Sequence, residues 1–91
     1  MKLRWTGKAL ADLERLYDFL AVVNPPAAAR TVQSLTKTPT RLLANSRIGE
    51  QLFEFEGREV RRIIVGKYEI RYEIQDSCIY ILRLWHTREQ R

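Results

Sequence analysis

The sequence has very little of the chemistry on which many enzymes depend. It contains one cysteine, Cys78, and one histidine, His86. A single cysteine cannot form an internal disulfide, which favours a reducing compartment, the cytoplasm. A single histidine, with no pair of cysteines at metal-binding spacing, predicts no metal site within the chain. There is also no Gly-rich phosphate loop and no Ser or Cys beside a candidate base, so we expect no cofactor.

Long apolar runs are missing as well. The opening residues, MKLRWTGKAL, lack the apolar stretch of a signal peptide or a membrane span, so we expect no membrane association. The 91 residues suffice for one small domain, residues 1–91, with one core. Sixteen Lys and Arg against eleven Asp and Glu give a net charge of +5. This excess favours an acidic partner, nucleic acid or protein, although a generic basic surface would have the same composition.

What the sequence does have is β-structure near its C-terminal end. Apolar and polar residues alternate without a break over residues 68–75, as in a strand with one buried and one solvated face. Short polar turns separate this segment from apolar runs at residues 59–65 and 78–85. Three such runs predict an antiparallel meander.

The last run of the meander is apolar on both faces. Its alternating sets are Tyr80, Leu82 and Leu84 on one face and Ile79, Ile81 and Trp85 on the other. A single helical layer covers only one face of a sheet. We therefore predict that the second set stays exposed and, together with Arg83, binds a protein partner. The alternative is that Trp85 folds over the sheet edge and the row closes on itself or on a second copy of the chain.

Two helices are predicted before the meander. Thr6 is a suitable N-cap for an amphipathic helix that ends near Val23, and Asn24-Pro25 supplies a cap and a first-turn proline for a second helix. Thr38 is expected to cap a further short turn, and residues 51–55 to be irregular or a short extra strand. With a strand at residues 2–5, the fold class is α+β: a two-helix hairpin on one face of a small antiparallel sheet, in the order β-α-α-β-β-β.

Cationic side chains are concentrated in the C-terminal part of the chain. Guanidinium groups bind phosphates as a planar fork, and nearby aromatic rings offer stacking surfaces for bases. The alternative is ion pairing across strands, which we favour for Arg71. Arg61 and Arg62 are neighbours in a strand and must point to opposite faces, so one of them should lie toward the helices or a groove floor. The cations are Arg58, Arg61, Arg62, Lys67, Arg71, Arg83, Arg88 and Arg91.

A collinear set of residues along the whole chain resembles the RelE/ParE family of bacterial toxins. The set comprises Trp5, Ala9, Asp12-Leu13, Asn24-Pro25, Ala27-Ala28, Leu43 through Gly49, Gly57, Arg61-Arg62, the alternating residues Tyr68 to Ile74, and Leu84-x-His86-x-Arg88. Ser46 departs from the pattern, because many members have a proline before the glycine loop. The resemblance implies a toxin that a cognate antitoxin binds and silences in a hetero-oligomeric complex. We expect this antitoxin to dock on the exposed row of Ile79, Ile81 and Trp85, together with Arg83.

The resemblance also implies one of two activities. RelE-like members cleave messenger RNA in the ribosomal A site, whereas ParE-like members inhibit DNA gyrase. Metal-free RNA cleavage needs a base, an acid and cations around the phosphate. If the chain were a nuclease, the matching residues would be Arg62, His86 and Arg88.

The nuclease set is incomplete in this sequence. Glu69 and Thr87 stand where RelE-like chains tend to have arginines, and no tyrosine follows Trp85. We therefore predict a gyrase-inhibiting binding protein, with a metal-independent endoribonuclease as the alternative. A toxin-derived scaffold without activity is a third possibility. The predicted target-binding residues are Arg61, Arg62, His86 and Arg88, and the segment 85–91 is expected to serve toxicity more than folding.

Overall fold

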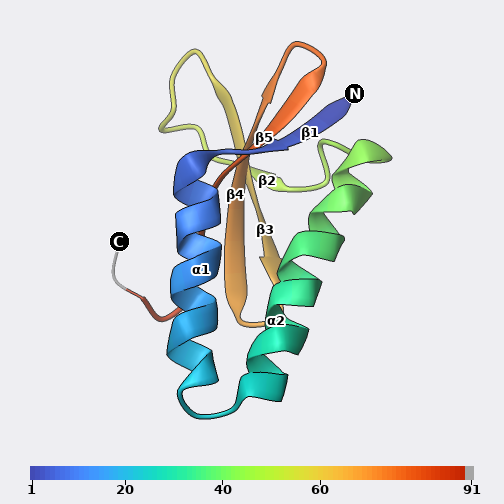
Figure 1. Ribbon diagram of the computed structural model, residues 1–91. Coiled ribbons are helices and arrows are strands. Elements are labelled where there is room, and N and C mark those ends of the chain that lie inside the picture. Colours follow the sequence, from blue (N-terminus) through green and yellow to red (C-terminus); the bar gives the residue numbers. More distant parts are fainter. Residues whose placement is uncertain (90–91) are drawn as a thin grey trace.

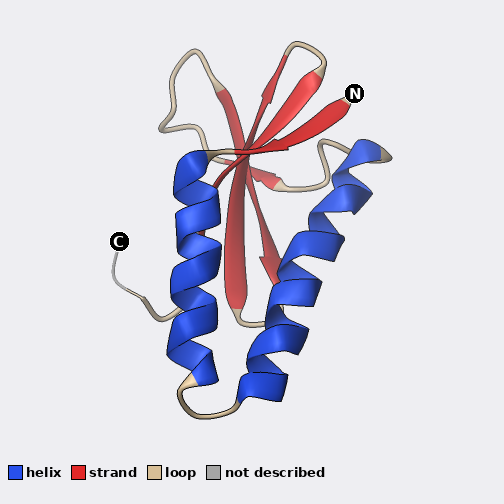
Figure 2. Cartoon of the chain, viewed as in Figure 1, coloured by secondary structure: helices blue, strands red, loops and turns tan. Residues whose placement is uncertain are grey.

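The computed structural model describes residues 1–89 and shows a helical hairpin laid across one face of a single sheet (Figure 1). The elements are β1 (Lys2–Trp5), α1 (Gly7–Ala21), α2 (Pro25–Lys37), the 3-10 helix η1 (Thr38–Leu43), β2 (Glu50–Gln51), β3 (Glu59–Val65), β4 (Tyr68–Gln75) and β5 (Cys78–His86). Both long helices lie on the same side of the strands (Figure 2). The predicted α+β class and single helical layer are confirmed. Within residues 1–89, no helix is long and apolar enough to cross a membrane.

We predicted a purely antiparallel sheet, but the sheet is mixed. Its strand order is β1-β5-β4-β3-β2, and β3, β4 and β5 form the expected antiparallel meander. The two-residue strand β2 extends the sheet beyond β3. At the other edge, β1 pairs with β5 in parallel, with Leu3 opposite Ile79. Parallel neighbours need a long connection between them, and the helical hairpin and meander together supply it.

The helix starts follow the signals in the sequence. The Thr6 hydroxyl accepts a hydrogen bond from the Ala9 N–H at 3.1 Å, and the Asn24 side chain accepts one from the Ala27 N–H at 3.1 Å. The prediction for the third helical segment is wrong in detail. Thr38 is the first residue of η1 and not its cap, and no side chain caps that helix.

A β-bulge interrupts the alternation of β5. Tyr72 of β4 lies opposite Ile81, whereas its neighbour Arg71 lies opposite Arg83, so Leu82 is an extra residue in β5. An extra residue exchanges the two faces for all side chains that follow it. The apolar residues of β5 therefore do not form one continuous row on each face of the sheet, contrary to our prediction.

The bulge overturns the predicted exposed row of Ile79, Ile81 and Trp85. Ile79 and Ile81 are 0% exposed and belong to the core under the helices, as does Leu84 after the bulge. Trp85 lies on the opposite face, where it is only 6% exposed. The two isoleucines are thus core residues and are not available to a partner.

The core anchors the loop between η1 and β2 as well. The buried Tyr72 hydroxyl donates to the Ser46 carbonyl at 2.7 Å and accepts from the Gly49 N–H at 3.0 Å. A Cβ atom at Gly49 would lie 2.6 Å from the Tyr72 hydroxyl and 2.7 Å from the Arg62 carbonyl, so only glycine fits there. The core consists of Ala9, Leu16, Leu35, Leu42, Ile70, Tyr72, Ile74, Ile79, Ile81 and Leu84.

Candidate functional site

The sheet face without helices, here called the open face, carries a stack of guanidinium groups and aromatic rings. The Arg71 guanidinium lies 5.4 Å from the Phe55 ring centroid and 4.9 Å from that of Trp85. Arg58 also contacts Phe55, at 5.7 Å, and Arg83 also contacts Trp85, at 5.8 Å. Cation–π contacts of this kind contribute about 0.5–2 kcal/mol each. This arginine–aromatic stack explains how Trp85 is buried without a helix above it.

Glu69 lies at the centre of the open face and is 1% exposed. Its carboxylate is 3.3 Å from the Arg71 guanidinium and 3.5 Å from that of Arg62. Arg62 also binds Glu50 at 2.8 Å. Arg71 is ion-paired as we favoured, but its partner Glu69 lies in the same strand, β4, and not across strands as predicted. Arg62, predicted as a target-binding or catalytic cation, shares its charge with two carboxylates.

Asp12 of α1 joins the helical layer to the edge of β5. It accepts hydrogen bonds from the Arg83 guanidinium at 2.7 Å and from the Leu84 N–H at 2.9 Å. Pairing between β1 and β5 ends at Ile81, so Asp12 satisfies an N–H beyond the end of β1. Burial disfavours the charged carboxylate, but hydrogen bonds from Arg83 and Leu84 outweigh it and lower the pKa of Asp12. Arg83, predicted to bind the antitoxin, is thus engaged within the chain.

Arg61 and Arg62 point to opposite faces of β3, as expected for neighbouring strand residues. Arg61 lies opposite Tyr72, on the side of the helices. Its guanidinium donates to Glu59 at 2.9 Å and to the Gly49 carbonyl at 2.7 Å, and its side chain is 14% exposed. Arg61 therefore holds the loop before β2 and presents little surface to a target.

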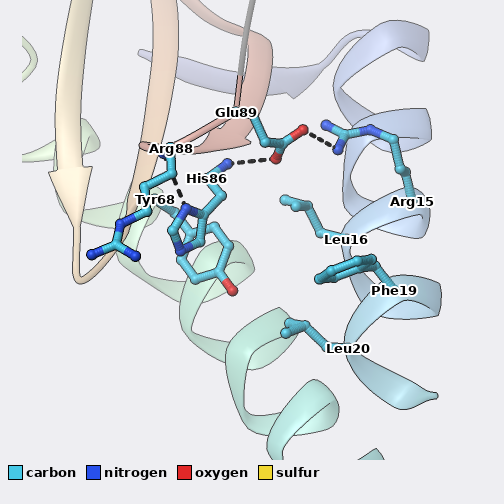
Figure 3. Close-up of a pocket in the computed structure, with 8 residues that line it drawn as sticks. All are labelled: Arg15, Leu16, Phe19, Leu20, Tyr68, His86, Arg88 and Glu89. Atoms are coloured by element: carbon cyan, nitrogen blue, oxygen red, sulfur yellow. Dashed lines mark hydrogen bonds and ion pairs between the residues drawn. The ribbon is translucent and has the colours of Figure 1, made fainter. Parts of the chain in front are cut away.

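His86 and Arg88 lie at a pocket of about 470 Å³ between α1 and the end of β5, here called the C-terminal pocket (Figure 3). The His86 ring packs edge-on against Tyr68, with ring centroids 5.3 Å apart. On the helix side the pocket is apolar, and its Phe19 is 76% exposed. The lining residues are Arg15, Leu16, Phe19, Leu20, Tyr68, His86, Arg88 and Glu89.

The turn that ends the described chain is tied to the rest of the molecule. Glu89 accepts a hydrogen bond from the His86 N–H at 2.7 Å and forms an ion pair with Arg15 of α1 (Figure 3). The Arg88 N–H donates to His86 Nδ1 at 3.1 Å, which leaves Nε2 to carry the proton of a neutral ring. We predicted that residues 85–91 serve toxicity more than folding, and that prediction did not include these structural contacts of the turn. Arg91 lies outside the described residues.

The structure separates the residues of the predicted nuclease set. Arg62 lies on the open face, whereas His86 faces α1 from the other side of the sheet. Their β4 partners, Arg71 and Tyr68, are also three positions apart, or about 10 Å along the strand. His86 and Arg88 remain together at the C-terminal pocket. Among residues 1–89, no three His, Cys, Asp or Glu side chains are grouped as metal ligands.

The sequence analysis did not identify several residues that contribute to the open face, the edge of β5 and the C-terminal pocket. Asp12 was named only as part of the family resemblance, although its spacing to Ala9 and Leu16 places it on the buried stripe of α1. A carboxylate at such a position signals a buried ion pair. Phe55 and Phe19 carried no local signal, because their roles depend on residues distant in the sequence.

The chain thus has a helical hairpin over one face of a small mixed sheet and a turn with Arg88 after the last strand. The family model described as the ParE toxin of the type II toxin–antitoxin system, parDE, matches residues 3–91. The chain belongs to this family of type II toxins.

Individual relatives carry both family names. The chain is 35% identical to toxin RelE2 of Caulobacter vibrioides over 83 residues, which cover 91% of each chain. It is 32% identical to toxin RelE1 of the same organism, covering 92% of this chain and 90% of that one. The solved chromosomal ParDE system of P. aeruginosa matches with a TM-score of 0.80 at 29% identity, covering 94% of this chain and 95% of that one. The toxin–antitoxin complex RelBE2 of Mycobacterium tuberculosis gives a TM-score of 0.57 at 27% identity, covering 93% and 88%.

Proposed function

We propose that this toxin inhibits DNA gyrase in the cytoplasm without cutting RNA, and that a cognate antitoxin neutralises it. The match to the ParE family favours this target, because gyrase inhibition is the activity that the resemblance implies for ParE-like chains. The observation that carries the proposal is the position of Arg62 and His86 on opposite faces of the sheet. A nuclease needs its acid, base and phosphate-binding cations around one scissile bond.

The charges of the open face argue against a phosphate there. A scissile phosphate at Arg62 or Arg71 would also lie close to Glu50 and Glu69, whose carboxylates are 2.8 to 3.5 Å from these guanidinium groups. The carboxylates would repel the phosphate, and binding would have to break existing ion pairs. Arg58 is engaged in the same way, by Glu73 at 2.7 Å. The open face therefore serves stability better than RNA cleavage.

The C-terminal pocket offers a surface that suits a protein target. Phe19 and the adjoining Val22 and Val23 at the tip of the helical hairpin are more than three-quarters exposed. Exposed apolar groups of this kind are typical of protein interfaces, and nearby cations add specificity. We assign target contact to Phe19, His86 and Arg88. An antitoxin that covers these residues would silence the toxin by occlusion.

The direct test is a supercoiling assay with purified toxin, gyrase, relaxed plasmid and ATP. We expect the wild-type chain to reduce supercoiling, and Arg88→Ala to weaken inhibition about tenfold, the effect of losing about 1.4 kcal/mol of binding. Lys8→Ala is the matched control, because it removes an exposed cation at the opposite end of α1. Equal inhibition by all three proteins would remove Arg88 from the contact, and no inhibition at all would refute the gyrase proposal.

A second candidate function is RelE-like cleavage of ribosome-bound message. It is favoured by the names of the two Caulobacter relatives, both RelE toxins. Primer extension on messages from a translating extract distinguishes the two functions. Codon-specific cuts that are lost in both Arg62→Ala and His86→Ala would establish the nuclease. Intact message at toxin concentrations that block supercoiling would support the inhibitor.

A further inference from the structure

The positive charge of the chain is concentrated in one segment. Between Phe19 and Gly49 there are four Lys or Arg residues and no Asp or Glu, whereas the rest of the chain has twelve Lys and Arg against eleven Asp and Glu. This segment forms the end of α1, all of α2, and η1. One of its cations, Arg47, is neutralised by Glu59 at 2.8 Å. The remaining three set the electrostatic potential of this side of the molecule.

These three cations, Arg30, Lys37 and Arg41, form what we call the basic stripe. Arg30 and Lys37 are seven residues apart in α2 and so lie on one side of that helix, and Arg41 follows four residues later in η1. All three are exposed. Among residues 1–89, none of them forms an ion pair. The stripe therefore differs from the open face, where carboxylates hold the arginines.

The groove between Arg30 and Lys37 is polar. Arg30 and Lys37 border one shallow groove, whose other lining residues are Gln33, Ser34 and Thr36. A neighbouring groove of about 460 Å³ lies between α2 and the β3–β4 turn and adds the exposed Lys67. Leu35, Val65 and Tyr68 also line this second groove, so it is less polar than the first. The stripe is about 17 Å long at 1.5 Å per residue, which equals about five base-pair steps of 3.4 Å.

We propose that the basic stripe binds the phosphate backbone of a nucleic-acid duplex without reading its sequence. Lysine, arginine and hydroxyl side chains are the groups that contact phosphates. A protein partner would need apolar residues at the centre of its contact, and the groove bordered by Arg30 and Lys37 has none among its lining residues. Unpaired bases would need aromatic rings on which to stack, and that groove is lined by none.

The basic stripe is independent of the C-terminal pocket. In Figure 1 the turn that follows β5 lies beside α1, and α2 lies on the other side of that helix. None of the stripe cations lines the C-terminal pocket. The stripe variant should therefore inhibit the protein target as well as the wild type does, in an assay in which the toxin itself does not contact DNA. Duplex binding would hold the toxin on the nucleic acid at which such a target works.

The test is fluorescence anisotropy of a short labelled DNA duplex, and of an RNA duplex of the same sequence, titrated with the full chain at several salt concentrations. The test variant is Arg30→Gln/Lys37→Gln/Arg41→Gln. The matched control is Lys2→Gln/Arg4→Gln/Lys8→Gln, which removes the same charge from three other exposed positions. Thermal melts of both variants check that they remain folded.

We expect the wild-type chain to bind both duplexes with a steep salt dependence. Each phosphate contact contributes about 0.9 to the steepness of the plot of log K against log salt. For the stripe variant, which lacks three cations, this slope should therefore be shallower by nearly three, and the affinity should fall at least tenfold. The control should stay within about threefold of the wild type. Equal losses in both variants would show diffuse attraction and overturn the proposal. Binding of polyglutamate but of neither duplex would overturn it in favour of an acidic protein partner.

Discussion

The two faces of the sheet are buried by different means. On the covered face, Ile70 and Tyr72 are shielded by the helices and pack as an ordinary core. On the open face, their neighbours Glu69 and Arg71 are shielded by each other and by the rings of Phe55 and Trp85. Apolar burial drives folding directly, whereas a buried ion pair contributes little net stability but is costly to break. Burial on the covered face therefore drives folding, whereas the ion pairs of the open face make its side-chain arrangement costly to change.

This difference bears on function. A nuclease would need cations on the open face that are available to a phosphate, but Arg62 and Arg71 are occupied by Glu50 and Glu69. Among residues 1–89, the cations without an ion pair include Arg30 and Lys37 of α2 and Arg88 of the C-terminal turn. Contacts with partners are accordingly expected around the helices and not on the open face.

The largest effect is expected from breaking the covered face with Ile81→Asp. An unpaired carboxylate among core residues should lower the free energy of unfolding by about 4 kcal/mol or more, which approaches the whole stability of a domain of this size. Circular dichroism melts of the toxin alone measure it. Tyr80→Asp, one position earlier and on the other face, is the control and should cost about 1 kcal/mol. A folded Ile81→Asp toxin that lost only its antitoxin would restore the exposed-row prediction.

Breaking the open face should have a smaller but substantial effect. Trp85→Ala removes the ring between Arg71 and Arg83 and should lower the free energy of unfolding by about 3 kcal/mol. Phe53→Ala is the control, because Phe53 is exposed, and it should change stability by less than about 0.5 kcal/mol. Urea denaturation measures both. Similar values for the two variants would mean that the open face is an ordinary solvated surface.

The link between the helical layer and the sheet edge is tested by Asp12→Asn. The pKa of Asp12 is lowered on folding, so its contribution is complete above the unfolded value and is lost as pH falls through the folded value. At neutral pH we expect Asp12→Asn to be about 2 kcal/mol less stable than the wild type, because it loses the charged bonds to Arg83. The difference should shrink as the solution is acidified.

Denaturant melts from neutral to acidic pH measure this prediction. Asp18→Asn is the control, since Asp18 is an exposed carboxylate on the same helix and forms no ion pair among residues 1–89. It should stay within about 0.5 kcal/mol of the wild type at neutral pH. A pH-independent difference for Asp12→Asn would show that lost packing, and not charge, is responsible.

The sequence alone determined the local elements of this protein. The caps at Thr6 and Asn24 and the alternation of residues 68–75 predicted the helix starts and the central strand, because each signal lies within one turn or one strand. The opposite directions of Arg61 and Arg62 were predictable for the same reason.

Only the tertiary structure decided how these elements meet. The bulge at Leu82 depends on the register between β4 and β5, and it moved Ile79 and Ile81 from a predicted interface into the core. The partners of Arg62 and Arg83 come from other elements, namely β2, β4 and α1. Register and ion pairing are relations between distant residues, so the local periodicity of either strand does not encode them.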